Sequence, residues 1–82
     1  MDIIITLKDG SEHTLPVFRL MECGIDQKTF FLENKKKGRV EFPIDSLSGF
    51  RIDRPKALRV LPEAGDFIVL NTASIILSQL LP

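Results

Sequence analysis

Few residues in this sequence are of the types that carry out acid–base, nucleophilic or metal chemistry. It has one histidine, His13, and one cysteine, Cys23, which together make neither a zinc-ligand cluster nor a histidine-containing triad. Ser46 and Ser48 lack the flanking glycines that present a nucleophilic serine at a tight turn. The acidic residues lie in turns or alternate with apolar residues, as solvated carboxylates do. We therefore expect no enzymatic activity, no metal and no cofactor, with His13 an ordinary strand residue.

The basic residues are the clearest candidates for ligand contact, because lysine and arginine bind phosphate groups. Residues 35–59 hold eight bases against three acids, although the whole chain is neutral, with 11 basic and 11 acidic residues. A phosphate or nucleic-acid contact would use the bases of one turn and those that the fold brings beside it: Lys35, Lys36, Lys37, Arg39, Arg51 and Arg54, with Lys56 and Arg59. The alternative is a solvated hairpin tip. Overall neutrality and the absence of tryptophan and tyrosine make nucleic acid the less favoured partner.

The end of the chain is apolar and carries no charge from Phe67 onward. With sixteen residues that include asparagine, threonine, serine and glutamine, it is too short and too polar to cross a bilayer. We expect it to pack on protein, either in the core of the same chain or at an interface with a second copy or another protein. The residues expected at such an interface are Phe67, Ile76, Leu77, Leu80 and Leu81.

Length and composition fit one small folded domain that covers residues 1–82. The chain has 82 residues, of which 44% are apolar and 27% charged, as in ordinary soluble domains. An acidic residue at position 2 and a strand-like start are unlike a secretory signal, so we expect a cytoplasmic protein with no membrane contact.

The first third of the sequence predicts a hairpin. Residues 1–7 are rich in β-branched side chains, and residues 8–10 form a turn that ends in glycine. A three-residue loop with Gly10 in the left-handed region pairs Ile3 with Leu15 and Ile5 with His13, whereas a two-residue loop would pair these isoleucines with less suitable residues. The second strand is predicted to be long and curved, over residues 14–22, with Val17 and Met21 on one face.

The middle of the sequence predicts two more strands and a helical turn. Residues 23–27 are expected to form a loop, residues 28–34 a strand and residues 34–38 a turn. Residues 39–45 alternate strictly between polar and apolar side chains, and Pro43 places this strand at a sheet edge or a bulge. Residues 45–49 have the composition of a single helical turn, and residues 50–53 resume as a strand.

The last third predicts mixed structure. We expect a short strand over residues 57–61, a turn over 62–66 and a buried strand over 67–70. Residues 71–81 suit either a strand or a short helix capped by Asn71 and Thr72, and the helix is favoured because no turn glycine separates them from the preceding strand.

Five short strands with a one-turn helix before the fifth are typical of small barrels of the Src-homology and Sm-like type. The stretch IIITLKDGSE, residues 3–12, resembles the opening of an Sm-like domain, where a charged turn with glycine leads into a long bent strand. The resemblance implies a mainly β fold, a small, strongly bent barrel of five to six strands with a 3-10 turn and an apolar C-terminal strand or helix. It implies none of that family's RNA-binding residues, because the loop over residues 25–29 keeps only Asp26 of the family's aspartate and asparagine, and the Arg-Gly signature has no counterpart after Phe42. Pro16 and Val17 also stand where such domains carry a glycine.

A second stretch, IDSLSGFRI over residues 44–52, is similar to a turn of PilZ domains, which implies a cyclic dinucleotide as an alternative ligand. The arginine pair that precedes this turn in those domains is absent. The function expected from the whole sequence is a non-enzymatic interaction or adaptor protein that forms a homo-oligomer or contacts another protein. An Sm-like nucleic-acid binder that uses the basic hairpin is the main alternative.

Overall fold

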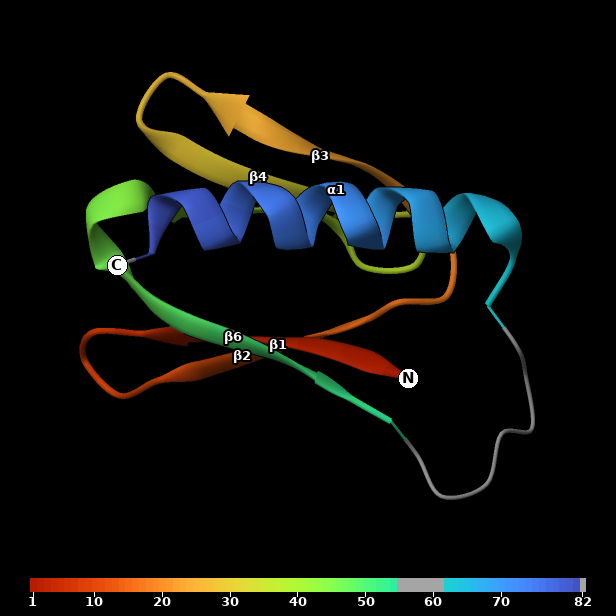
Figure 1. Cartoon of the computed structure of the whole chain (residues 1–82), viewed down its shortest axis with the longest axis horizontal. Helices are drawn as coiled ribbons and strands as arrows, with labels where there is room; N and C mark the ends of the chain where they lie inside the picture. Colours follow the sequence, from red (N-terminus) through yellow and green to blue (C-terminus); the bar gives the residue numbers. More distant parts are fainter. Residues whose placement is uncertain (55–61, 82) are drawn as a thin grey trace.

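The computed structural model describes residues 1–54 and 62–81, which form two three-stranded antiparallel sheets and one helix (Figure 1). The first sheet has the order β2-β1-β6, with β1 at Asp2–Leu7, β2 at Glu12–Pro16 and β6 at Leu47–Asp53. The second sheet has the order β3-β4-β5, with β3 at Leu20–Asp26, β4 at Thr29–Asn34 and β5 at Gly38–Pro43. A 3-10 turn, η1 at Ile44–Ser46, joins the sheets, and α1 covers Ala64–Leu80. The predicted mainly β architecture is confirmed.

The first hairpin has the predicted register. Ile3 pairs with Leu15 and Ile5 with His13, and Gly10 has a φ of 90°, in the left-handed region that favours glycine. The Leu7 amide donates to the Ser11 carbonyl at 2.9 Å, which closes the loop. The Asp9 carboxylate accepts hydrogen bonds from the Ser11 hydroxyl and amide, and these bonds lower the pKa of Asp9.

The predicted single strand over residues 14–22 is wrong, because the chain changes sheet within it. β2 ends at Pro16, which has no amide hydrogen for a ladder, and β3 starts at Leu20. Arg19 between them has a φ of 65°, which turns the chain sharply. The register then shifts between Leu20 and Glu22, so Met21 is exposed and does not share the buried face of Val17.

The predicted loop over residues 23–27 is also wrong, since the chain is extended to Asp26. Cys23 and Ile25 pair with Leu32 and Phe30, and a two-residue turn begins at Gln27, whose φ is 59°. Glycine and aspartate are weak strand formers, so the pairing with β4 decides the conformation here.

Strand β4 and the edge position of β5 are confirmed. Phe30 and Leu32 are fully buried between the sheets, and β5, which contains Pro43, lies at one edge of the second sheet. The predicted helical turn over residues 45–49 is shorter than expected, because it ends at Ser46. Leu47 is buried and pairs with Leu7 at the start of β6.

The predicted turn over residues 62–66 and strand over residues 67–70 are wrong, because α1 already begins at Ala64. A capping box fixes this start: the Glu63 amide donates to the Asp66 carboxylate at 2.9 Å, and the Glu63 side chain accepts from the Asp66 amide. Asn71 and Thr72 therefore lie within the helix rather than at its cap. The predicted C-terminal helix is confirmed but has 17 residues, and the strand predicted over residues 57–61 lies outside the described residues.

The core lies between the two sheets and is closed on one side by α1. In Figure 1 the helix runs in front of the space between the second sheet above and the first sheet below. The helix contributes its buried face, Leu70, Ala73 and Leu77, to the same apolar cluster as Ile3, Ile5, Phe30 and Leu32. The helix contacts β3, one edge of the second sheet, and leaves the other edge, β5, uncovered.

Candidate protein interface on α1 and β3

The solvent face of α1 carries exposed isoleucines and no charge, where a surface helix is normally charged. Ile68 and Ile75 are 67% and 59% exposed, and residues seven apart lie on the same face of a helix. Thr72 and Gln79 are exposed on that face as well, and α1 has no charged residue after Asp66. Nothing within the described chain covers these isoleucines.

Strand β3 adds two exposed apolar side chains beside the helix. Met21 is 57% and Ile25 is 49% exposed, and Cys23, midway between them, contacts α1 by donating its thiol to the Val69 carbonyl at 3.6 Å. Met21 and Ile68 line the same cavity, of about 530 Å³, at the start of both elements. We call Met21, Ile25, Ile68 and Ile75 the β3–α1 surface.

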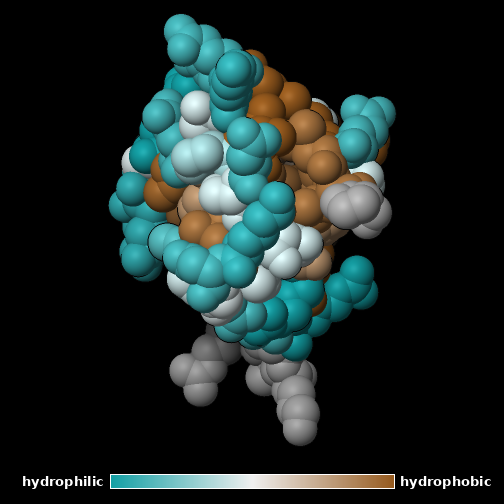
Figure 2. Space-filling view, turned by 90° about the vertical axis from the view of Figure 1, so that its left-hand side faces the viewer, coloured by the Kyte–Doolittle hydropathy of each residue, from teal (hydrophilic) through white to brown (hydrophobic). Residues whose placement is uncertain are grey.

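The figures agree with this arrangement. In Figure 1, β3 and α1 run in the same direction, so both elements finish at the same end of the molecule. Figure 2 views that end and shows hydrophobic atoms gathered in one area between groups of hydrophilic side chains. Exposed apolar side chains that lie together in this way are candidates for contact with another protein.

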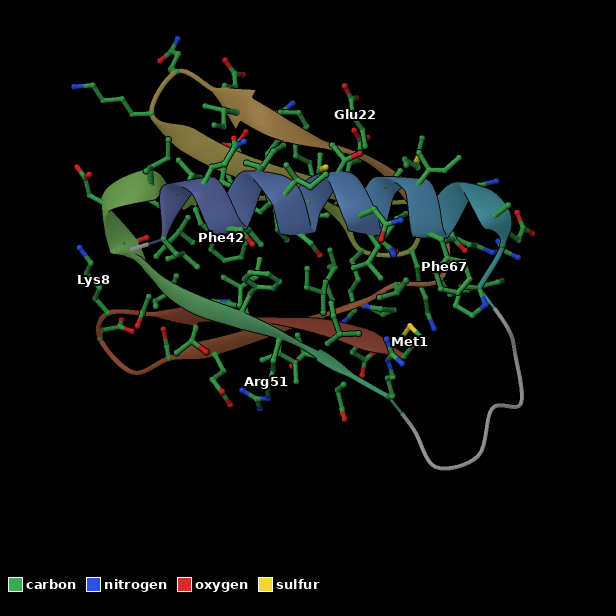
Figure 3. The ribbon with its side chains drawn as sticks, in the orientation of Figure 1. Met1, Lys8, Glu22, Phe42, Arg51 and Phe67 are labelled. Atoms are coloured by element: carbon green, nitrogen blue, oxygen red, sulfur yellow. The ribbon has the colours of Figure 1, made fainter. Side chains whose placement is uncertain are left out.

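The interface residues predicted from the sequence have different environments. Leu77 is fully buried and belongs to the core, whereas Ile76, Leu80 and Leu81 are half-buried and pack against the core from its edge. Phe67 is 41% exposed, on the side of α1 that faces the first sheet (Figure 3). Sequence reasoning missed Ile68 and Ile75, although their seven-residue spacing is a helical signal.

The cysteine in this region is unsuited to nucleophilic chemistry. Burial raises the pKa of the Cys23 thiol, and the nearby carboxylate of Glu22 adds to this effect. Both effects disfavour the thiolate, which is the nucleophilic form of cysteine, and the thiol instead contacts the Val69 carbonyl.

The described basic residues that were predicted to form one phosphate-binding surface are distributed over several faces, and Lys56 and Arg59 lie outside the described residues. Arg39 lies on the outer face of the second sheet, where its guanidinium stacks 3.8 Å above the Phe31 ring and pairs with Glu41 and Asp26. Arg51 points away from the core on the outer face of the first sheet and pairs with Glu12 (Figure 3). Arg54 is exposed just beyond β6.

The three lysines remain together in the exposed turn between β4 and β5. Lys35 and Lys36 line a cavity of about 400 Å³ with Arg19 and Phe18, a neighbour that the sequence did not suggest. The Arg19 carbonyl accepts a hydrogen bond from the Lys35 amide at 3.0 Å, which fixes the corner against the turn.

Comparisons with protein-family models, with curated proteins and with solved structures found no match to this chain. Among residues 1–54 and 62–81, no helix has the length and apolar character needed to cross a membrane.

Proposed function

We propose that this chain is a non-enzymatic interaction protein that associates with a second copy of itself through the β3–α1 surface. The observation that supports this proposal is the pair of exposed isoleucines, Ile68 and Ile75, on an uncharged helix face beside the exposed Met21 and Ile25. In water these side chains gain free energy by being covered.

A second copy fits this surface electrostatically. The chain has no net charge, so two copies do not repel each other at long range, and no charged side chain interrupts α1 after Asp66. Two-fold symmetry places the same patch on both sides of the contact, which suits an apolar surface facing itself.

The outer edge of β3 gives a geometry for this contact. The Ile44 amide donates to the Lys28 carbonyl, and the register between β4 and β5 is unbroken, so the even-numbered residues of these two strands bond each other. The odd-numbered residues of β4 therefore bond β3. The amide and carbonyl groups of Cys23 and Ile25 then point outward, and no strand in the described residues pairs with them. Antiparallel pairing of two β3 strands about Cys23 would set Met21 of each copy opposite Ile25 of the other.

The interaction module is proposed to be a small, strongly bent barrel of the Sm-like or Src-homology type. Three features support this: the three-residue corner between β2 and β3, the 3-10 turn between β5 and β6, and antiparallel sheets around one core.

The test is the oligomeric state of the wild type and of Ile68→Asp/Ile75→Asp, measured by sedimentation velocity at micromolar to millimolar concentrations. Covering a half-exposed isoleucine contributes about 1–2 kcal/mol, so four isoleucines in a dimer contribute about 4–8 kcal/mol, and their loss should make the protein monomeric. The helix should remain, because both positions are exposed.

Two controls make the result decisive. Ser48→Asp adds a charge to an exposed position on β6, in the first sheet, and should leave the dimer intact, whereas Leu77→Asp should unfold the chain. A wild type that stays monomeric throughout, or a double variant that keeps the dimer mass, contradicts the proposal.

A second candidate function, contact with nucleic acid, is favoured by the grouping of Arg19 with Lys35, Lys36 and Lys37. If it holds, affinity for single-stranded RNA falls as salt rises, and replacing the three lysines by glutamine flattens the log–log slope by about two to three. No binding at low salt contradicts it.

A further inference from the structure

A cleft lies on the side of the core that α1 does not cover, between the edge strands β2 and β5. Its volume is about 530 Å³, within the range of sites that take small ligands or several side chains. Four apolar residues from both sheets line it: Ile5, Leu15, Val40 and Phe42. Phe42 lies between the sheets in Figure 3, and the His13 ring meets it edge-on, with the centroids 5.2 Å apart.

The backbone of β2 is unpaired along this cleft. Leu7 donates to the Ser11 carbonyl and Val17 donates to the Met1 carbonyl, so the odd-numbered residues of β2 bond β1. The amide and carbonyl groups of Glu12 and Thr14 therefore point away from β1. Pro16 ends this edge, since it has no amide hydrogen and its carbonyl accepts from the Asn34 side chain.

The backbone of β5 is open in the same way. Its even-numbered residues bond β4, as the bond from the Ile44 amide to the Lys28 carbonyl shows, so the amides and carbonyls of Arg39 and Glu41 point outward. No strand in the described chain pairs with this edge, and Pro43 ends it. β5 thus offers two donors and two acceptors at alternate positions next to an apolar cleft.

The charges around the cleft favour an acidic ligand. The two carboxylates that line it each pair with an arginine, Glu12 with Arg51 and Glu41 with Arg39, which also pairs with Asp26. Lys37 also lines the cleft, and among the described residues it makes no ion pair. Its neighbours Lys35 and Lys36 add positive charge in the same turn.

We propose that this cleft binds an extended segment of a partner protein, which adds a strand to the outer edge of β5. Alternate side chains of the segment enter the cleft against Val40 and Phe42, and an acidic residue at one end meets Lys37. This site lies at the opposite edge of the second sheet from the β3–α1 surface, so a self-associated protein can bind such a segment. The inference does not depend on self-association.

The experiment uses synthetic peptides and the Ile68→Asp/Ile75→Asp variant as well as the wild type, which separates this site from the dimer contact. The probe is an eight-residue peptide of alternating valine and threonine that begins with two aspartates. One matched peptide replaces the aspartates by lysines. Another carries N-methyl groups on the threonines, which removes the main-chain donors that would face Arg39 and Glu41. Binding is followed by amide chemical shifts and amide hydrogen exchange.

The acidic peptide should bind both proteins at submillimolar concentration and slow hydrogen exchange at the amides of Arg39 and Glu41. Lys37→Glu should weaken this binding about fivefold and should favour the lysine peptide instead. Lys8→Glu, a charge reversal at an exposed residue that does not line the cleft, should have no effect. Absence of binding at millimolar peptide, or equal binding of the N-methylated peptide, overturns the proposal. Concentration-dependent protection of the same amides without peptide overturns it in favour of a second copy in the cleft.

Discussion

Replacement of Asn34 tests how the two sheets are held together. This side chain is fully buried at the end of β4, and its amide nitrogen donates to the carbonyls of Pro16 and Phe18 at 2.7 and 2.8 Å. Its oxygen accepts from the amides of Lys36 and Lys37 at 2.8 and 3.2 Å. All its hydrogen-bonding capacity is used, and it links the corner between the sheets to the basic turn.

The cost of losing this side chain follows from those four bonds. At about 0.5–1.5 kcal/mol each, Asn34→Ala should lower the free energy of unfolding by about 2–6 kcal/mol. A domain of this size has only about 5 kcal/mol of stability, so the alanine variant should be largely unfolded. Because the chain has neither tryptophan nor tyrosine, far-ultraviolet circular dichroism during urea unfolding is the appropriate assay.

Asn34→Asp separates hydrogen bonding from volume, since the shape is nearly kept. The second carboxylate oxygen would face two carbonyl oxygens, which favours the protonated form in the folded state and raises the pKa of the new carboxyl. The folded state then holds its proton to higher pH than the unfolded state, so stability falls as pH rises through about 4 and above. Asn71→Asp makes the same change at an exposed helix position and should lack this behaviour. An Asn34→Asp variant within about 0.5 kcal/mol of wild type at pH 7 would refute the reasoning.

Three further predictions concern other parts of the fold. Arg51 lowers the pKa of Glu12, so the ionised carboxylate stabilises the fold above its unfolded pKa, and this stabilisation is lost as pH falls. The small difference in unfolding free energy between the wild type and Arg51→Gln should therefore vanish in acid. A difference that stays the same in acid would contradict the pairing. Burial raises the pKa of Cys23, so iodoacetamide should alkylate it about tenfold more slowly in the native protein than in urea, and equal rates would show that the thiol is accessible. A Cβ at Gly24 would lie 3.2 Å from the Phe31 ring, so Gly24→Val should cost about 1–3 kcal/mol in urea unfolding, beyond the cost of Gly49→Val, where the space is open.

Elements with a strict local pattern were predictable from the sequence. The β1–β2 register follows from parity, because only the three-residue loop brings Ile3 and Ile5 opposite Leu15 and His13. The alternation of polar and apolar side chains in β5, and the edge position implied by Pro43, could likewise be predicted from the sequence.

Elements fixed by distant contacts were not predictable. The corner at residues 17–19 depends on Asn34, whose partners lie 16 and 18 residues away in sequence. Residues 67–70 have the local composition of a buried strand, but the capping box at Glu63 and Asp66 and the packing on β3 make them helical.

The candidate interface was predictable only at the level of the element. An uncharged C-terminal stretch indicated contact with protein, but it did not show which residues are buried. Leu77 is buried and Ile75 exposed because of how α1 is rotated about its axis against the core. That rotation follows from a helix start at Ala64 that the sequence pattern did not reveal. The partners of Arg39 and Arg51 likewise come from neighbouring strands.

The position of α1 in the chain affects how the protein folds as it is made. The six strands found in the described residues leave the ribosome before the helix that supplies Leu70, Ala73 and Leu77 to their core. Until those residues emerge, the helix does not cover the β3 side of the apolar interior. Cys23 also lacks its hydrogen-bond partner, the Val69 carbonyl, which lies 46 residues further along the chain. Synthesis at about 5–20 residues per second delivers the helix about 2–9 s after β3, which is long compared with the microseconds in which a local hairpin forms. The nascent strands therefore pass through a stage with exposed phenylalanines and open edges, at which chaperones that bind apolar segments would act.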